Sequence, residues 1–141
     1  MKKTLISTIS LILTLVFMLS LFSCAPKKEA ELWDDAVYKE SVTLGEGEKT
    51  LTVELKVNEH LITFTLKTDK ATVGEALSEH NLISGDEGPY GLYVKVVNGM
   101  TADYDIDQSY WAFYINGEFA MTGIDVTEIT EGDLYRIEYS R

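Results

Sequence analysis

The chain has 141 residues, a formal net charge of −11 and a single cysteine. This length suits one domain preceded by a leader segment. The acidic balance argues against a nucleic acid partner, because phosphate groups would be repelled. One cysteine allows no disulfide within the chain, so the fold must depend on its hydrophobic core.

The first residues, MKKTLISTISLILTLVFMLSLFSC, place two lysines before a long uncharged run. This pattern predicts a secretory signal peptide over residues 1–23, with an uncleaved membrane anchor as the alternative. The end of the run, Leu21-Phe22-Ser23-Cys24, resembles a bacterial lipoprotein processing site. The resemblance implies that Cys24 is lipidated and becomes the new N-terminus. We therefore expect a protein anchored by lipid to the cell membrane and facing outside.

Residues 24–48 are charged and irregular, and we interpret them as a tether that leads to a domain over residues 49–141. Trp33, Val37 and Tyr38 leave the alternative that part of the tether contacts the domain. From Thr50 the sequence alternates apolar and polar residues up to Val57, and Ile62, Phe64 and Leu66 repeat the alternation after a turn. This period of two predicts an antiparallel hairpin.

A short helix follows. Thr72 and Glu75 have the spacing of a capping box, in which each side chain accepts a hydrogen bond from the backbone of the other residue. Apolar residues then recur at helical spacing, and Ser84-Gly85 is the expected end of the helix. One helix of this size covers a single face of a sheet.

The later elements are strands. The run LYVKVV, residues 92–97, predicts a third strand, and LYRIEY, residues 134–139, predicts the last one. Two strands, a helix and further strands are the order of an α+β domain of β-grasp-like type. We expect a small mixed sheet of four to five strands, with one helix packed on one face.

The stretch SYWAFYINGEFAMTG, from Ser109 to Gly123, predicts a β-hairpin whose two-residue turn is Asn116-Gly117. The register implied by this turn pairs Tyr114 with Phe119. One face then holds Trp111, Phe113, Ile115 and Ala120, which we assign to the core, and the other holds Tyr110, Ala112, Tyr114, Phe119 and Met121.

The second face of the hairpin is also apolar, yet nothing in the sequence is assigned to cover it. Rings with polar groups and a flexible thioether suit a surface that is wet part of the time. One interpretation is a binding surface, since an exposed apolar patch usually indicates a partner. The alternative is a minor core, closed by the loop around Tyr104 or by the segment around Trp33.

The TVGEAL helix and the segment from Gly88 to Tyr139 resemble the transcobalamin-like C-terminal domain family, which is common in lipoproteins and surface proteins of Gram-positive bacteria. The resemblance covers residues 50–139, and its most specific parts are Tyr110-Trp111, Ile115-Asn116-Gly117-Glu118 and Gly132-Asp133. In cobalamin carriers such a domain forms one wall of the cobalamin site, and a large helical domain forms the other. The resemblance implies a binding edge at Tyr110, Trp111 and the hairpin after them, which ends near Gly123. Within it, our candidate ligand-binding residues are Tyr110, Trp111, Tyr114, Phe119 and Met121.

The sequence shows no catalytic constellation. His60 and His80 lie at a strand turn and on the helix, and no serine has the context of a nucleophile elbow. Asp103, Asp105 and Asp107 alternate as in calcium loops, but Gln108 and Tyr114 stand where an EF-hand needs glycine and glutamate. We therefore expect no enzyme, no metal and no cofactor, with a weak surface calcium site on this acidic loop as the alternative to a solvated loop.

Two functions remain. The first is an extracytoplasmic module that binds a ligand on the aromatic hairpin, with a corrinoid as first candidate. The second is an interaction or adhesion module that docks onto a surface protein and has no small-molecule ligand.

Overall fold

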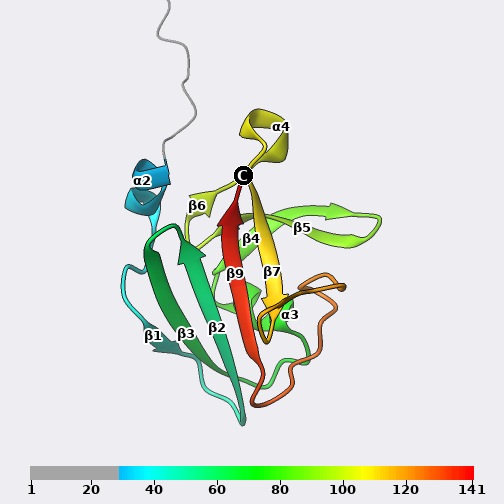
Figure 1. Cartoon of the computed structure of the whole chain (residues 1–141). Helices are drawn as coiled ribbons and strands as arrows, with labels where there is room; N and C mark the ends of the chain where they lie inside the picture. Colours follow the sequence, from blue (N-terminus) through cyan, green and yellow to red (C-terminus); the bar gives the residue numbers. More distant parts are fainter. Residues whose placement is uncertain (1–28) are drawn as a thin grey trace, which may run out of the picture.

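The computed structural model describes residues 29–141, which form two β-sheets and several short helical segments (Figure 1). The strands of the larger sheet are β1 (Val42–Leu44), β2 (Lys49–Val57), β3 (His60–Thr68), β7 (Tyr110–Ile115), β8 (Glu118–Phe119) and β9 (Leu134–Ser140). The strands of the smaller sheet are β4 (Ile83–Gly88), β5 (Gly91–Val97) and β6 (Met100–Thr101). The helical segments are α2 (Glu29–Leu32), the 3₁₀ turn η1 (Trp33–Asp35), α3 (Val73–Glu79) and α4 (Tyr104–Asp107).

The predicted signal peptide and Cys24 lie outside the described residues. Within residues 29–141, no helix has the length and apolar character that a membrane crossing requires.

The larger sheet has the strand order β1-β3-β2-β9-β7-β8. The first predicted hairpin is confirmed, because β2 and β3 pair antiparallel from Lys49 opposite Thr68 to Val57 opposite His60. At the centre of the sheet, β2 pairs in parallel with β9, and β9 pairs antiparallel with β7. The sheet is therefore mixed, and the expected α+β class is confirmed.

Apolar and polar residues alternate along the strands, so that one face of the larger sheet is buried. The apolar residues on this face form the core with residues of α3 and of the smaller sheet, such as Leu77 and Met100. On the opposite face, Arg136 binds Glu54 at 2.7 Å and Lys56 binds Glu138 at 2.9 Å. These partly exposed ion pairs identify the second face as solvated.

The sheet is larger than expected and has a different cover. We predicted four to five strands under one helix, but the larger sheet has six strands, and β5 belongs to a second sheet of order β4-β5-β6. Six strands span about 24 Å, whereas a helix of seven residues is only about 10 Å long. Because α3 is too short to cover this width, the smaller sheet and the N-terminal turn complete the layer.

The predicted capping box is present at α3. Thr72 Oγ1 accepts a hydrogen bond from the Glu75 amide at 3.3 Å, and Glu75 Oε2 accepts one from the Thr72 amide at 3.2 Å. The predicted end of the helix is wrong, because α3 ends at Glu79 and Ser84-Gly85 lie in β4. A bulge separates these two residues, and a Cβ at Gly85 would lie 1.9 Å from the Tyr93 carbonyl oxygen. This glycine therefore allows two strands to approach closely.

The described part of the expected tether, residues 29–48, packs against the domain. Trp33 is buried and stacks on His60, with 4.4 Å between the ring centroids. Farther along, β1 pairs in parallel with β3, which adds an edge strand to the larger sheet. An irregular, charged segment thus contributes both a core residue and a strand.

Candidate functional site

The hairpin of β7 and β8 turns at Asn116-Gly117, as the sequence predicts. Both residues have positive φ, 51° and 83°, which is the conformation of the turn that matches strand twist. The predicted pairing of Tyr114 with Phe119 is present. The Asn116 side chain also donates to Asp133 at 2.9 Å and accepts from the Leu134 amide at 2.9 Å. The turn is therefore fixed to the start of β9.

The inner face of the hairpin belongs to the core, as we assigned it. Trp111 is buried, and its indole N–H donates to the Lys95 carbonyl oxygen at 3.1 Å. Phe113 stacks on the buried Tyr135, with 6.2 Å between ring centroids. Trp111 thus connects the two sheets, and 9% of its surface remains exposed.

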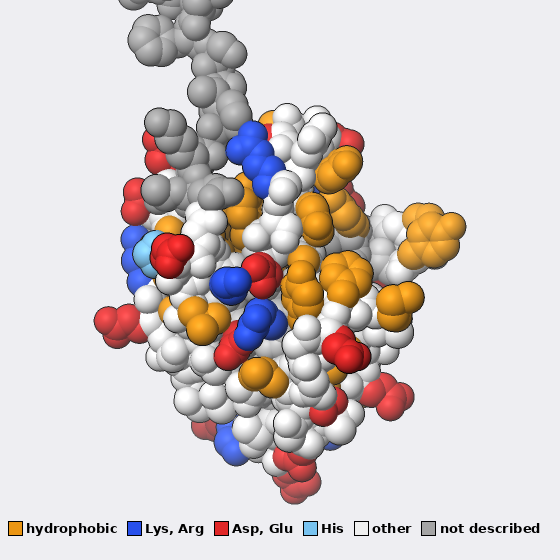
Figure 2. Space-filling view, viewed as in Figure 1, with side chains coloured by type: hydrophobic (Ala, Val, Ile, Leu, Met, Phe, Trp, Pro, Cys, Tyr) orange, Lys and Arg blue, Asp and Glu red, His pale blue; other side chains and the backbone are white. Residues whose placement is uncertain are grey.

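The outer face of the hairpin is open within the described part of the chain. Phe119 and Met121 are 60% and 94% exposed, and Tyr114 is half-buried with its ring against Phe119 at 5.6 Å. Apolar side chains gather over β7 and toward the β4–β5 hairpin, beside the charged centre of the sheet (Figure 2). On the same face Ala112 is buried, and the Tyr104 ring contacts Tyr110 at one end. Because Phe119 and Met121 stay exposed, the minor-core alternative does not hold for that part of the face.

A cavity of about 190 Å³ lies where the two sheets meet, and we call it the seam cavity. It opens between β5 and the hairpin. Its lining is mostly apolar and includes both the inner edge of the hairpin and the loop that follows it. The lining residues are Leu92, Tyr93, Val94, Trp111, Phe113, Phe119, Ala120, Thr122, Gly123, Ile124 and Ile137.

A second, wider depression adjoins the seam cavity and shares Tyr93 with it. Tyr93, Tyr104, Asp105 and Tyr110 line an open space of about 600 Å³, which we call the tyrosine hollow. Tyr104 and Tyr110 meet edge to face, with 6.5 Å between their ring centroids. Of the five predicted ligand-binding residues, the fold therefore places Tyr110 here, Trp111 and Phe119 at the seam cavity, and Tyr114 and Met121 on the outer surface.

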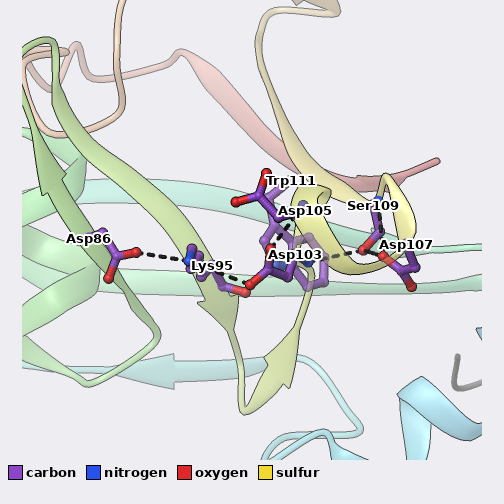
Figure 3. Close-up of polar contacts among 7 residues, drawn as sticks. All are labelled: Asp86, Lys95, Asp103, Asp105, Asp107, Ser109 and Trp111. Atoms are coloured by element: carbon purple, nitrogen blue, oxygen red, sulfur yellow. Dashed lines mark hydrogen bonds and ion pairs between the residues drawn. The ribbon is translucent and has the colours of Figure 1, made fainter. Parts of the chain in front are cut away.

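The acidic loop before β7 is organised by its own hydrogen bonds. Asp103 caps α4 by accepting from the Asp105 amide at 3.0 Å. Ser109 donates to Asp107 from its hydroxyl and its amide, which holds the pKa of the Asp107 carboxyl below its usual range. Asp103 also binds Lys95, and Figure 3 shows Lys95 between Asp86 and Asp103.

Lys95 is the cation of this cluster. Its ammonium group lies 2.8 Å from Asp86 and 3.4 Å from Asp103. The hydrogen bond to Asp86 is the largest cause that raises the pKa of Lys95 above its ordinary value. Over residues 29–141, no group of three or more histidine, cysteine or acidic side chains is arranged to hold a metal ion. The loop carries Tyr104 in α4 and leads to Tyr110 at the start of β7.

The two histidines have structural surroundings. His60 stacks on Trp33, and His80 caps the end of α3 beside Gly45. The two side chains thus lie in separate parts of the fold.

Sequence reasoning missed Tyr93 and the tyrosine hollow. The alternation of LYVKVV already places Tyr93 on the side of the strand opposite Leu92 and Val94, which was the available signal. Its proximity to Tyr110 depends on the contact between β5 and β7, which belong to different sheets.

The fold and the site define a small α+β domain in which an aromatic hairpin borders a cavity between two sheets. Residues 70–141 match the family described as "Domain of unknown function (DUF4430)", and the chain belongs to that family. No curated protein matches the chain.

The solved structures that are similar to the chain include the following two. One is a candidate metal binding protein from Ruminococcus gnavus ATCC 29149, with 33% identity and a TM-score of 0.62, over 67% of this chain and 98% of that one. The other is haptocorrin in complex with Cbi, with 17% identity and a TM-score of 0.51, over 70% of this chain and 26% of that one. The likeness to haptocorrin is one of fold, and it agrees with the predicted resemblance to transcobalamin-like domains.

Proposed function

We propose that the protein is an extracytoplasmic ligand-binding module, anchored to the cell membrane through lipidated Cys24, and that it is not an enzyme. We assign its domain to the β-grasp-like class, because α3 lies in the chain between the hairpin β2–β3 and the strand β9 that pairs in parallel with β2. The proposed ligand is a corrinoid, which is a large ring system with an apolar body and polar substituents.

The observation that carries this proposal is the open aromatic face of the hairpin beside the seam cavity. Tyr114, Phe119 and Met121 offer apolar contact area, and the tyrosine hydroxyl can orient polar substituents. An exposed apolar patch of this kind is uncommon on a protein without a partner. A macrocycle that lies on these side chains would remove them from water.

The expected affinity is modest. Burial of about 200 Å² of apolar surface contributes roughly 5 kcal/mol, which is close to the lower estimates of the cost of association. The chain matches only 26% of haptocorrin. In cobalamin carriers, as the resemblance implies, a helical domain supplies a second wall. We therefore propose that a second copy or a separate protein completes a tight site.

A metal role is not proposed for the described residues. The similar Ruminococcus gnavus protein is a candidate metal binding protein, but residues 29–141 contain no group of three or more suitable ligands.

Absorption spectroscopy of the purified protein during a titration with dicyanocobinamide tests the proposal. We expect a saturable shift of the visible bands that Tyr114→Ala and Phe119→Ala weaken by about threefold or more. Leu61→Ala is the matched control, because Leu61 is an exposed apolar residue of β3, three strands away from β7 in the same sheet. A titration without any spectral shift, or equal losses in all three variants, would contradict the proposal.

The proposed anchor has a separate test. Cells that express the protein and are labelled with a palmitate analogue should incorporate label into the wild type and not into Cys24→Ala. Labelling that persists in this variant would reject lipidation at Cys24.

A protein–protein module is the second candidate function. The larger sheet ends at the two-residue strand β8, and beyond it Met121 and Val126 are exposed. A two-residue edge offers few unpaired backbone groups for strand addition. The exposed apolar side chains at this border are therefore what favours docking of another protein. Crosslinking from position 121 on intact cells distinguishes the two candidates: one defined partner, together with no cobinamide binding, supports docking.

A further inference from the structure

The tyrosine hollow combines three aromatic rings from distant parts of the sequence. Tyr93 comes from β5, Tyr104 from α4 and Tyr110 from β7, and all three border the same open space. Their exposed fractions are 45%, 55% and 38%. The backbone of each tyrosine is thus fixed in a helix or strand, while much of its ring surface remains available to a ligand.

One carboxylate accompanies these rings. Asp105 lines the hollow, and within residues 29–141 no hydrogen bond or ion pair occupies its side-chain oxygens. The nearby cation Lys95 is already bound between Asp86 and Asp103. Asp107 accepts from Ser109. Asp105 is therefore the carboxylate of this cluster that remains available to a bound molecule.

We propose that the tyrosine hollow is a binding site for an organic cation of the quaternary ammonium class. The faces of aromatic rings carry negative partial charge and attract a cation within about 6 Å of the ring centroid. The rings of Tyr104 and Tyr110 meet at an interplanar angle of 61°, with 6.5 Å between their centroids. A cation that lies in the angle between the two rings can therefore contact both. Asp105 adds the charge complement, and the net charge of −11 attracts cations and repels anions.

The quaternary ammonium class fits this site better than a primary ammonium ion. A primary ammonium ion can donate to Asp105. Tyrosine ring faces accept no conventional hydrogen bonds, so the rest of its lost hydration would not be replaced. A quaternary ammonium group has no N–H donor and exposes methyl groups that pack on the rings. An open space of about 600 Å³ accommodates such a headgroup.

This site shares Tyr110 with the proposed corrinoid surface but does not depend on corrinoid binding. Tyr114 does not line the tyrosine hollow. Tyr114→Ala should therefore leave cation binding unchanged even where it weakens cobinamide binding, and the two proposals can fail separately.

Proton NMR titration of the purified protein with choline chloride tests the inference. The neutral control is 3,3-dimethyl-1-butanol, which has the shape of choline but a carbon in place of the nitrogen, and sodium chloride controls for ionic strength. We expect an upfield shift of the choline N-methyl resonance and a Kd on the order of millimolar. The neutral analogue should bind at least about fivefold more weakly.

Variants at the hollow identify the groups responsible. Tyr104→Leu should weaken choline binding about two- to fivefold, whereas Tyr104→Phe, which keeps the ring, should retain it. Asp105→Asn should also weaken it. The matched control is Tyr90→Leu, because Tyr90 is 95% exposed and lines neither cavity.

Three outcomes would overturn the inference. They are equal binding of choline and its neutral analogue, unchanged affinity in Tyr104→Leu, and a loss in Tyr90→Leu as large as that in Tyr104→Leu. Circular dichroism of each variant, which should match the wild type, separates a lost contact from a lost fold.

Discussion

Asn98 connects the N-terminal segment to the smaller sheet, and its replacement should cost much of the stability of the domain. The side chain is buried. Its oxygen accepts from the Tyr38 amide at 2.9 Å, and its nitrogen donates to the Tyr38 carbonyl oxygen at 2.8 Å. The Asn98 carbonyl oxygen accepts from the Val37 amide at 2.9 Å. The Asn98 side chain thus bonds both backbone groups of Tyr38, as the backbone of a neighbouring strand would.

Two terms contribute to the expected cost of Asn98→Ala. The substitution removes both side-chain hydrogen bonds and leaves the partly buried Tyr38 groups without them, which costs about 2 kcal/mol. Asn98 also has a φ of 52°, a left-handed conformation that costs alanine roughly 1 kcal/mol more. We therefore expect the free energy of unfolding to fall by about 3 kcal/mol.

Asn58→Ala separates these two terms. Asn58 has the same φ of 52° but an exposed side chain, so its replacement should cost only about 1 kcal/mol. Urea unfolding followed by tryptophan fluorescence measures both variants, because Trp33 and Trp111 are buried. If Asn98→Ala loses no more stability than Asn58→Ala, the hydrogen-bonded connection to Tyr38 does not stabilise the fold.

Two further substitutions test the bulge and the acidic loop. Gly85→Ala should destabilise the domain by about 2 kcal/mol or more, because its Cβ would lie 1.9 Å from a backbone oxygen. Gly88→Ala is the control in the same urea assay. It should be nearly neutral, because the nearest contact of its Cβ is at 3.5 Å. Ser109→Ala should raise the lowered pKa of Asp107 toward its ordinary value of 3.8, as measured by NMR titration of the carboxyl carbon. A carboxyl group with a lowered pKa stabilises the fold at pH values above its ordinary pKa, and this stabilisation is lost as the pH falls through the folded pKa. The difference in stability between the wild type and Ser109→Ala should therefore become smaller in acid.

Local patterns in the sequence predicted the local parts of the fold. Asn116-Gly117 specifies its own turn, because both residues tolerate positive φ, and the turn then sets which residues share a face. The capping box at Thr72 similarly marks the start of α3. Such features depend on a few neighbouring residues.

Contacts between distant segments could not be predicted in this way. The alternation in β5 identifies a strand but not its partners, and a strand of either sheet would have the same pattern. Tyr93 is part of a site because the fold brings β5 close to β7. The N-terminal segment is a second example, because its charged residues resemble those of a tether while a few residues, Leu32, Trp33 and Ala36, are buried in the core.

Trp33→Ala tests whether this segment is an integral part of the domain. A buried tryptophan that is cut back to alanine costs about 3–5 kcal/mol when the surrounding structure stays in place. If residues 29–48 instead detach as a unit, the loss in the free energy of unfolding cannot exceed the free energy with which this segment docks onto the domain. For Trp33→Ala we expect a single unfolding transition by circular dichroism, with a free energy of unfolding at least about 3 kcal/mol below that of the wild type. Val37→Ala is the control and should change almost nothing, because Val37 is exposed. An unchanged main transition in Trp33→Ala would show that residues 29–48 are an accessory and that the remaining domain is stable alone.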